Sequence, residues 1–108
     1  MKFGKTPAAV GKYRLSKAAE DDLIGIALFS DEHFGVAQSN RYRDQLERRF
    51  TALAEQPLQY PAVDHLREEY RRSVCGVHSI FFRIDGKIVE LIRILKNQDP
   101  QKQLWVWM

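Results

Sequence analysis

The sequence has a single cysteine, Cys75, so the chain cannot form an internal disulfide and offers no cysteine cluster for a metal ion. It also lacks any apolar run approaching the roughly 18 residues that a membrane-spanning helix needs. Lys2 and Lys5 lie near the N-terminus, but the apolar stretch 7–10 is too short for a secretory signal. We therefore expect a cytoplasmic protein with no disulfide, metal, cofactor or membrane segment.

Neither sign of charge dominates the 108 residues, which carry a net charge of +3 and have a pI near 9.2. This mild basicity suits an acidic partner or weak nucleic-acid contact, but it favours an ordinary solvated surface. We expect no sequence-specific nucleic-acid binding by the chain alone. Residues 1–11 contain glycine and proline without periodicity, which predicts a flexible lead-in, and residues 12–108 predict one domain.

The C-terminal part of the chain predicts a three-stranded antiparallel meander over residues 70–96. Asp85-Gly86 separates two runs rich in β-branched and aromatic residues, a strong hairpin signal. With Asp85 and Gly86 as the two loop residues, side chains alternate between two faces. One face carries Ile80, Phe82, Ile84, Val89, Leu91 and Leu95, with His78 and Arg93 at one end. The other carries Val77, Phe81, Ile88, Ile92 and Ile94 among Ser79, Arg83 and Glu90.

The first half of the chain predicts a short strand over 12–15 and two helices. Ser16 is a suitable N-cap for the first helix, which carries an apolar face that includes Ile24, Leu28 and Phe34. Gly35 is a suitable C-terminal cap, and a second helix over 36–55 follows it directly. A single stripe crosses the second helix: Tyr42, Leu46, Phe50 and Leu53. The short link predicts an antiparallel helical hairpin.

The element order is therefore strand, helix, helix and three strands, which predicts a two-layer α+β fold. The helical hairpin can cover only one face of the sheet. Because both faces of the predicted meander are largely apolar, the second face should need a partner or the tryptophan-containing tail to cover it.

Several short motifs occur along the chain in a characteristic order: Tyr13-Arg14-Leu15-Ser16, Phe34-Gly35-Val36, Leu53-Ala54-Glu55-Gln56-Pro57, Leu66-Arg67, Tyr70-Arg71-Arg72, the stretch 76–83, the stretch 89–95, and Asp99-Pro100. In this order and spacing they resemble the ParE branch of the ParE/RelE toxin superfamily of bacterial toxin–antitoxin systems. The resemblance runs from Tyr13 to about Leu104. It implies a β-α-α-β-β-β fold in which an antiparallel sheet packs against an α-helical hairpin.

The resemblance also implies a function: a non-enzymatic toxin that poisons DNA gyrase until a ParD-type antitoxin neutralises it. The C-terminal segment of such toxins is implicated in contact with the target. The candidate gyrase-binding residues are Gln98, Asp99, Leu104, Trp105 and Trp107. The antitoxin orders itself along the toxin, and its candidate contacts are Arg71, His78, Ile80, Phe82, Leu91 and Arg93.

Two alternatives stay open. The RelE branch has a similar fold but cuts mRNA in the ribosome, which requires a base, a cation and an acid. His78, Arg71 and Arg93 could supply such groups, but the tail lacks the tyrosine of RelE-type toxins. The second alternative is a degenerate member that binds an antitoxin without toxicity, because the tail 104–108 departs from the common ParE pattern.

Overall fold

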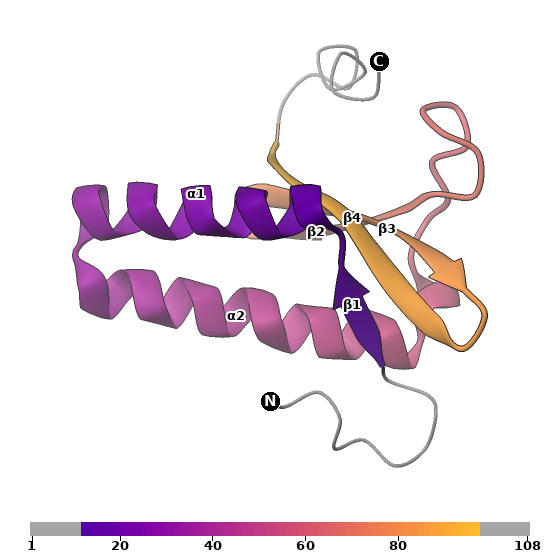
Figure 1. Cartoon of the computed structure of the whole chain (residues 1–108), viewed down its shortest axis with the longest axis horizontal. Helices are drawn as coiled ribbons and strands as arrows, with labels where there is room; N and C mark the ends of the chain where they lie inside the picture. Colours follow the sequence, from indigo (N-terminus) through magenta and orange to yellow (C-terminus); the bar gives the residue numbers. More distant parts are fainter. Residues whose placement is uncertain (1–11, 98–108) are drawn as a thin grey trace.

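The computed structural model describes residues 12–97, and the predicted order of elements is confirmed within them (Figure 1). Strand β1 (Tyr13–Leu15) leads into helices α1 (Lys17–Phe34) and α2 (Val36–Glu55). A short 3₁₀ turn, η2 (Pro57–Gln59), follows α2. The strands β2 (Arg71–Cys75), β3 (His78–Asp85) and β4 (Ile88–Lys96) come next. The lead-in 1–11 and the tail 98–108 lie outside the described residues.

The two helices begin and end where the sequence predicts. The Ser16 hydroxyl accepts the backbone N–H of Ala19 at 3.0 Å, which satisfies a donor in the first turn of α1. Gly35 has φ +86°, a conformation that side chains rarely adopt, and its N–H donates to the carbonyl of Asp31. The chain therefore reverses at one glycine, and α1 and α2 form the predicted hairpin.

The sheet has four strands in the order β1-β4-β3-β2. Strands β2, β3 and β4 form the predicted antiparallel meander, whereas β1 pairs with β4 in parallel, so the sheet is mixed. The β1 pairing covers only Val89–Leu91 of β4. Beyond it, the Asp22 carboxylate of α1 accepts the N–H of Ile94 at 2.9 Å. A helix side chain thus replaces a strand partner at this edge.

The register of the β3–β4 hairpin differs from the prediction in two respects. Asp85 pairs with Ile88, so the loop residues are Gly86 and Lys87 rather than Asp85 and Gly86. Gly86, with φ +65°, takes the first loop position, which favours glycine. Phe82 pairs with Leu91 but Phe81 pairs with Arg93, so Ile92 is the extra residue of a β-bulge.

The bulge changes which side chains of β4 reach the core. Ile94 now pairs with Ile80 and is buried in the core, whereas the uninterrupted alternation placed it on the opposite face. Leu95 pairs with Ser79, so it lies on the face opposite the one on which the uninterrupted alternation placed it. One extra residue reverses the face of every later side chain, because the period of a strand is two residues.

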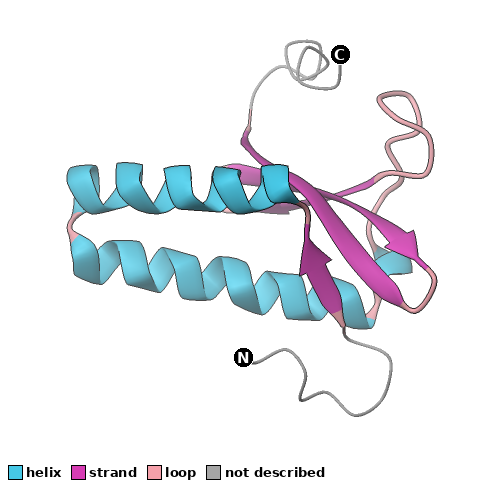
Figure 2. Cartoon of the chain, viewed as in Figure 1, coloured by secondary structure: helices cyan, strands magenta, loops and turns pink. Residues whose placement is uncertain are grey.

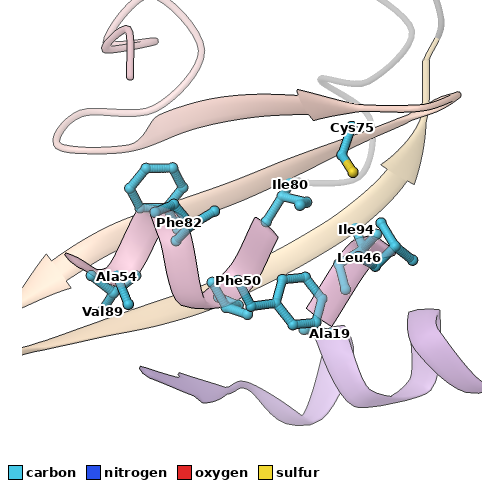
Figure 3. Close-up of a cluster of buried hydrophobic side chains, with 11 residues drawn as sticks. Ala19, Leu46, Phe50, Ala54, Cys75, Ile80, Phe82, Val89 and Ile94 are labelled. Atoms are coloured by element: carbon cyan, nitrogen blue, oxygen red, sulfur yellow. The ribbon is translucent and has the colours of Figure 1, made fainter. Parts of the chain in front are cut away.

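The hydrophobic core lies between the helical hairpin and one face of the sheet (Figure 3). The predicted stripe of α2 lies in or against it, with Leu46, Phe50 and Leu53 almost fully buried. Its sheet side consists of Cys75, Ile80, Phe82, Val89, Leu91 and Ile94. The helices extend past the strands at their joined end (Figure 2). Phe34, predicted on the apolar face of α1, and Ile24 and Leu28, predicted to widen that face, are exposed.

The second face of the sheet is not the apolar surface that the meander predicted. Arg14 of β1 pairs with Asp85 at 2.7 Å, and Arg83 pairs with Glu90 at 3.0 Å. Arg72 of β2 lies over the buried ring of Phe81, 6.0 Å from its centroid. The prediction failed because the flanking strands add arginines and the bulge removes Ile94. The charged part of this face therefore needs no partner to cover it.

No helix within residues 12–97 combines the length and apolarity needed to cross a membrane. In the same part of the chain, no three His, Cys, Asp or Glu side chains gather where they could hold a metal ion.

Candidate functional site

A groove of about 700 Å³ lies between the joined half of the helical hairpin and the end of the sheet. Its apolar lining comes from both helices, the β2–β3 turn and the end of β4: Ile26, Phe29, Phe34, Tyr42, Val77, Ile94 and Leu95. Its polar lining is Asp21, Asp22, Ser30, Gln38, Ser39, His78 and Lys96. Phe29, Phe34 and Val77 are 51%, 56% and 56% exposed. Concave, mostly apolar sites of this size commonly bind ligands or peptide segments.

The inner wall of the groove is built on Tyr42 and His78. The Tyr42 hydroxyl lies 2.7 Å from His78 Nδ1 and 3.2 Å from the Cys75 carbonyl, and it accepts the N–H of Val77. Gly76 makes this contact possible, because a Cβ there would lie 2.7 Å from the Tyr42 ring. The helix and the β2–β3 turn are thus held together at one hydroxyl.

The environment favours the neutral form of His78. Burial lowers the pKa of His78, and the positive charge of Lys96 lowers it further, whereas Asp22 acts in the opposite direction. Burial also raises the pKa of Tyr42. Nδ1 of a neutral imidazole can accept a hydrogen bond from the Tyr42 hydroxyl, in competition with the Cys75 carbonyl, so the pair is suited to a hydrogen bond near neutral pH.

Asp22, which lines the groove, forms an ion pair with Arg93 beside it. Nε and Nη2 of Arg93 donate to the two carboxylate oxygens of Asp22, at 2.7 and 2.9 Å, in a bidentate arrangement. The hydrogen bond to Asp22 raises the pKa of Arg93. Since the carboxylate also accepts the N–H of Ile94, one acidic side chain joins α1 to β4.

The model of the family described as the ParE toxin of the type II toxin–antitoxin system parDE matches residues 13–100. The chain belongs to this family. It is 39% identical over 83 residues to Toxin ParE1 of Caulobacter vibrioides, covering 77% of this chain and 85% of that protein. It is 31% identical over 88 residues to Toxin ParE1 of Mycobacterium tuberculosis, covering 81% and 90%.

A solved structure supports the ParE fold independently. The structure of a chromosomal ParDE TA system from P. aeruginosa has a TM-score of 0.71 with this chain, at 17% identity. The match covers 84% of this chain and all of that one. The predicted resemblance to ParE toxins and the predicted fold are thus confirmed, and the chain is the toxin of a type II system.

Three of the six predicted antitoxin contacts lie inside the ParE core. Ile80, Phe82 and Leu91 have no exposed surface and pack under the helices, so a partner could reach them only if the hairpin moved. The assignment of contacts by alternation did not anticipate that the hairpin covers this face.

The other three predicted contacts are partly exposed, at two separate places. His78 lines the groove, and Arg93 lies beside it on Asp22. Arg71 is not brought to the groove; it donates to the carbonyl of Tyr60. The predicted target contacts Gln98, Asp99, Leu104, Trp105 and Trp107 lie outside the described residues.

Sequence reasoning missed the groove itself, whose walls include Phe29, Phe34 and Val77. One signal was present. Helices of 18 and 20 residues extend about 27–30 Å, whereas four strands span about 14 Å between their outermost axes. A hairpin longer than the sheet is wide leaves part of its apolar surface uncovered.

Proposed function

We propose that this toxin inhibits DNA gyrase by binding to it, without a catalytic step of its own, and that a ParD-type antitoxin neutralises it. The match of the ParE family model over residues 13–100 carries the proposal, and the two curated relatives named Toxin ParE1 support it. A gyrase target also requires the protein to act in the cytoplasm.

The pairing of the basic side chains on the sheet favours binding over RNA cleavage. A nuclease of the RelE type needs a cation that can stabilise a pentavalent phosphate. Here Arg93 is held by Asp22, Arg83 is held by Glu90, and Arg71 donates to a backbone carbonyl. Each of these cations would have to leave its partner before it could contact a phosphate.

An antitoxin partner is proposed on the same family grounds. The structural neighbour is described as a ParDE toxin–antitoxin system, and its fold matches 84% of this chain with a TM-score of 0.71. Of the candidate contacts, the partly exposed His78, Arg93 and Arg71 are the ones that a docked antitoxin could touch without opening the core.

The proposal is tested by adding the purified, antitoxin-free toxin to DNA gyrase and relaxed plasmid. We expect supercoiling to stop, or cleaved DNA complexes to accumulate, and the cognate antitoxin to restore activity. Cleavage of ribosome-bound mRNA with gyrase unaffected would instead assign the toxin to the RelE-type nucleases. Normal growth on expression, together with tight antitoxin binding, would indicate a member without toxicity.

A second experiment locates the target contact. Trp105→Ala and deletion of residues 98–108 should each abolish toxicity while antitoxin binding persists, because interface tryptophans commonly dominate binding energy. Loss of antitoxin binding in both variants would show that the segment is structural instead.

A further inference from the structure

The groove leaves apolar side chains uncovered within the described part of the chain. Phe29 and Phe34 of the hairpin and Val77 of the β2–β3 turn all line it, and all three are more than half exposed. Exposed apolar side chains that are gathered in one hollow, rather than scattered, mark a surface that is covered by something.

The chain itself leaves the sheet at the rim of this groove. Ile94, Leu95 and Lys96, the last residues of β4, contribute to its lining. The next residue is fixed in place, because the Asn97 N–H donates to the Val77 carbonyl at 2.8 Å and its side chain reaches the Gly76 carbonyl. The last described residue therefore lies beside the β2–β3 turn.

The sequence beyond this point has a spacer followed by an apolar end. Residues 98–103 are polar apart from Pro100, and residues 104–108 are Leu, Trp, Val, Trp and Met. Six spacer residues can span up to about 20 Å, which is enough for residues 104–108 to reach back to a groove that begins at Lys96. The groove volume of about 700 Å³ also suits an indole ring with its neighbours.

We propose that residues 104–108 dock in the groove of their own chain in the free toxin, with an indole of Trp105 or Trp107 against Phe29, Phe34 and Val77. Docking removes apolar surface from water on both sides, and the tether raises the effective concentration of the segment. A target that engages these tryptophans, or a partner that enters the groove, must first displace the segment.

Tryptophan fluorescence tests the proposal directly, because the only two tryptophans of the protein are Trp105 and Trp107. In the free protein we expect blue-shifted emission, with acrylamide quenching about threefold weaker than in a peptide of residues 98–108. Phe29→Asp places a carboxylate in the groove, which disfavours apolar docking. It should lower the ratio of docked to free segment by about tenfold or more, so that acrylamide quenching rises to the value of the peptide. Val77→Asp should have the same effect from the opposite wall.

Leu28→Asp is the matched control, since Leu28 is the preceding residue of α1, is 65% exposed and does not line the groove. It should leave quenching unchanged, and circular dichroism should show all three variants folded. Quenching of the wild type at the peptide level would overturn the proposal, as would folded Phe29→Asp and Val77→Asp proteins that stay protected. Protection that disappears on dilution, together with a dimer in gel filtration, would show that the segment enters a second copy and would also overturn it.

Discussion

The two ends of the helical hairpin have similar side chains in very different surroundings. At the sheet end, Ala19, Leu46, Phe50 and Leu53 are buried against the strands. At the joined end, Leu28, Phe29, Phe34 and Val36 are more than half exposed. The difference follows from dimensions rather than composition, because the helices extend past the sheet. One end therefore supplies stability, and the other leaves apolar surface exposed.

The largest expected effect comes from truncating one phenylalanine at each end. Phe50→Ala, at a position 1% exposed, should lower the free energy of unfolding by about 3–5 kcal/mol, because it leaves a cavity in the core. Phe34→Ala, at a position 56% exposed, should change it by less than about 0.5 kcal/mol. Urea denaturation measures both, and equal losses would remove the distinction between the two ends.

The ion pair at the boundary between the two ends should give the next largest effect. Asp22→Asn removes the charge that holds Arg93 and weakens the bond to the Ile94 N–H, so we expect a loss of about 1.5–3 kcal/mol. Asp21→Asn is the control, since its 3.3 Å pair with Lys17 is exposed and should be worth less than about 0.5 kcal/mol. Similar values for the two variants in urea denaturation would argue against a joining role for Asp22.

A smaller effect should come from the glycine that lies against Tyr42. Gly76→Ala and Gly86→Ala both place a side chain at positive φ, which costs about 1–2 kcal/mol. Only Gly76→Ala also moves the Tyr42 ring, because nothing lies within 4 Å of a Cβ at Gly86. Gly76→Ala should therefore be the less stable variant in thermal unfolding and should alter the His78 NMR signals. If Gly86→Ala lowers the thermal stability as much and also alters the His78 signals, the close contact between Gly76 and Tyr42 is not the cause of these effects.

The smallest effect should be a pH dependence from the groove wall. The pKa of folded His78 lies below its ordinary value of 6.5, so the unfolded chain binds the proton more readily. The neutral His78 of the folded protein therefore contributes to the free energy of unfolding. This contribution is complete above about pH 6.5 and is lost as the pH falls through the pKa of folded His78. Since His78 is half-buried, we expect the change to stay below about 1 kcal/mol.

The measurement compares the wild type with His78→Gln in urea denaturation, at about pH 7.5 and about pH 5. The wild type should lose more stability on acidification than the variant, and a direct NMR titration should place the His78 pKa below 6.5. A wild type that gains stability relative to the variant in acid would contradict this assignment.

Local signals in the sequence predicted most of the fold. The Ser16 cap, the Gly35 reversal and the stripe through Leu46 and Phe50 are all effects of neighbouring residues, and the structure confirms them. The order of the elements follows from the same signals. Local signals could not predict the pairing of β1 with β4, because this contact joins residues more than seventy positions apart.

The bulge at Ile92 was not predictable from the strand sequence. Residues 88–95 read as continuous strand, with no glycine or proline to mark an irregularity. The bulge placed Ile94 in the core, and the long-range ion pair of Arg14 with Asp85 added charge to the face that seemed largely apolar in isolation. The groove was missed for a related reason, since it depends on how far the helices extend past the strands.

The most direct test of the central claim, that this fold acts by binding and not by catalysis, is the stoichiometry of inhibition. Increasing amounts of the purified toxin are incubated with a fixed amount of gyrase, and supercoiling is followed over time. We predict that inhibition rises with the toxin, levels off once gyrase is saturated, and does not increase with longer incubation. Progressive loss of gyrase activity at amounts of toxin far below those of gyrase, or full gyrase activity at every amount, would contradict the account.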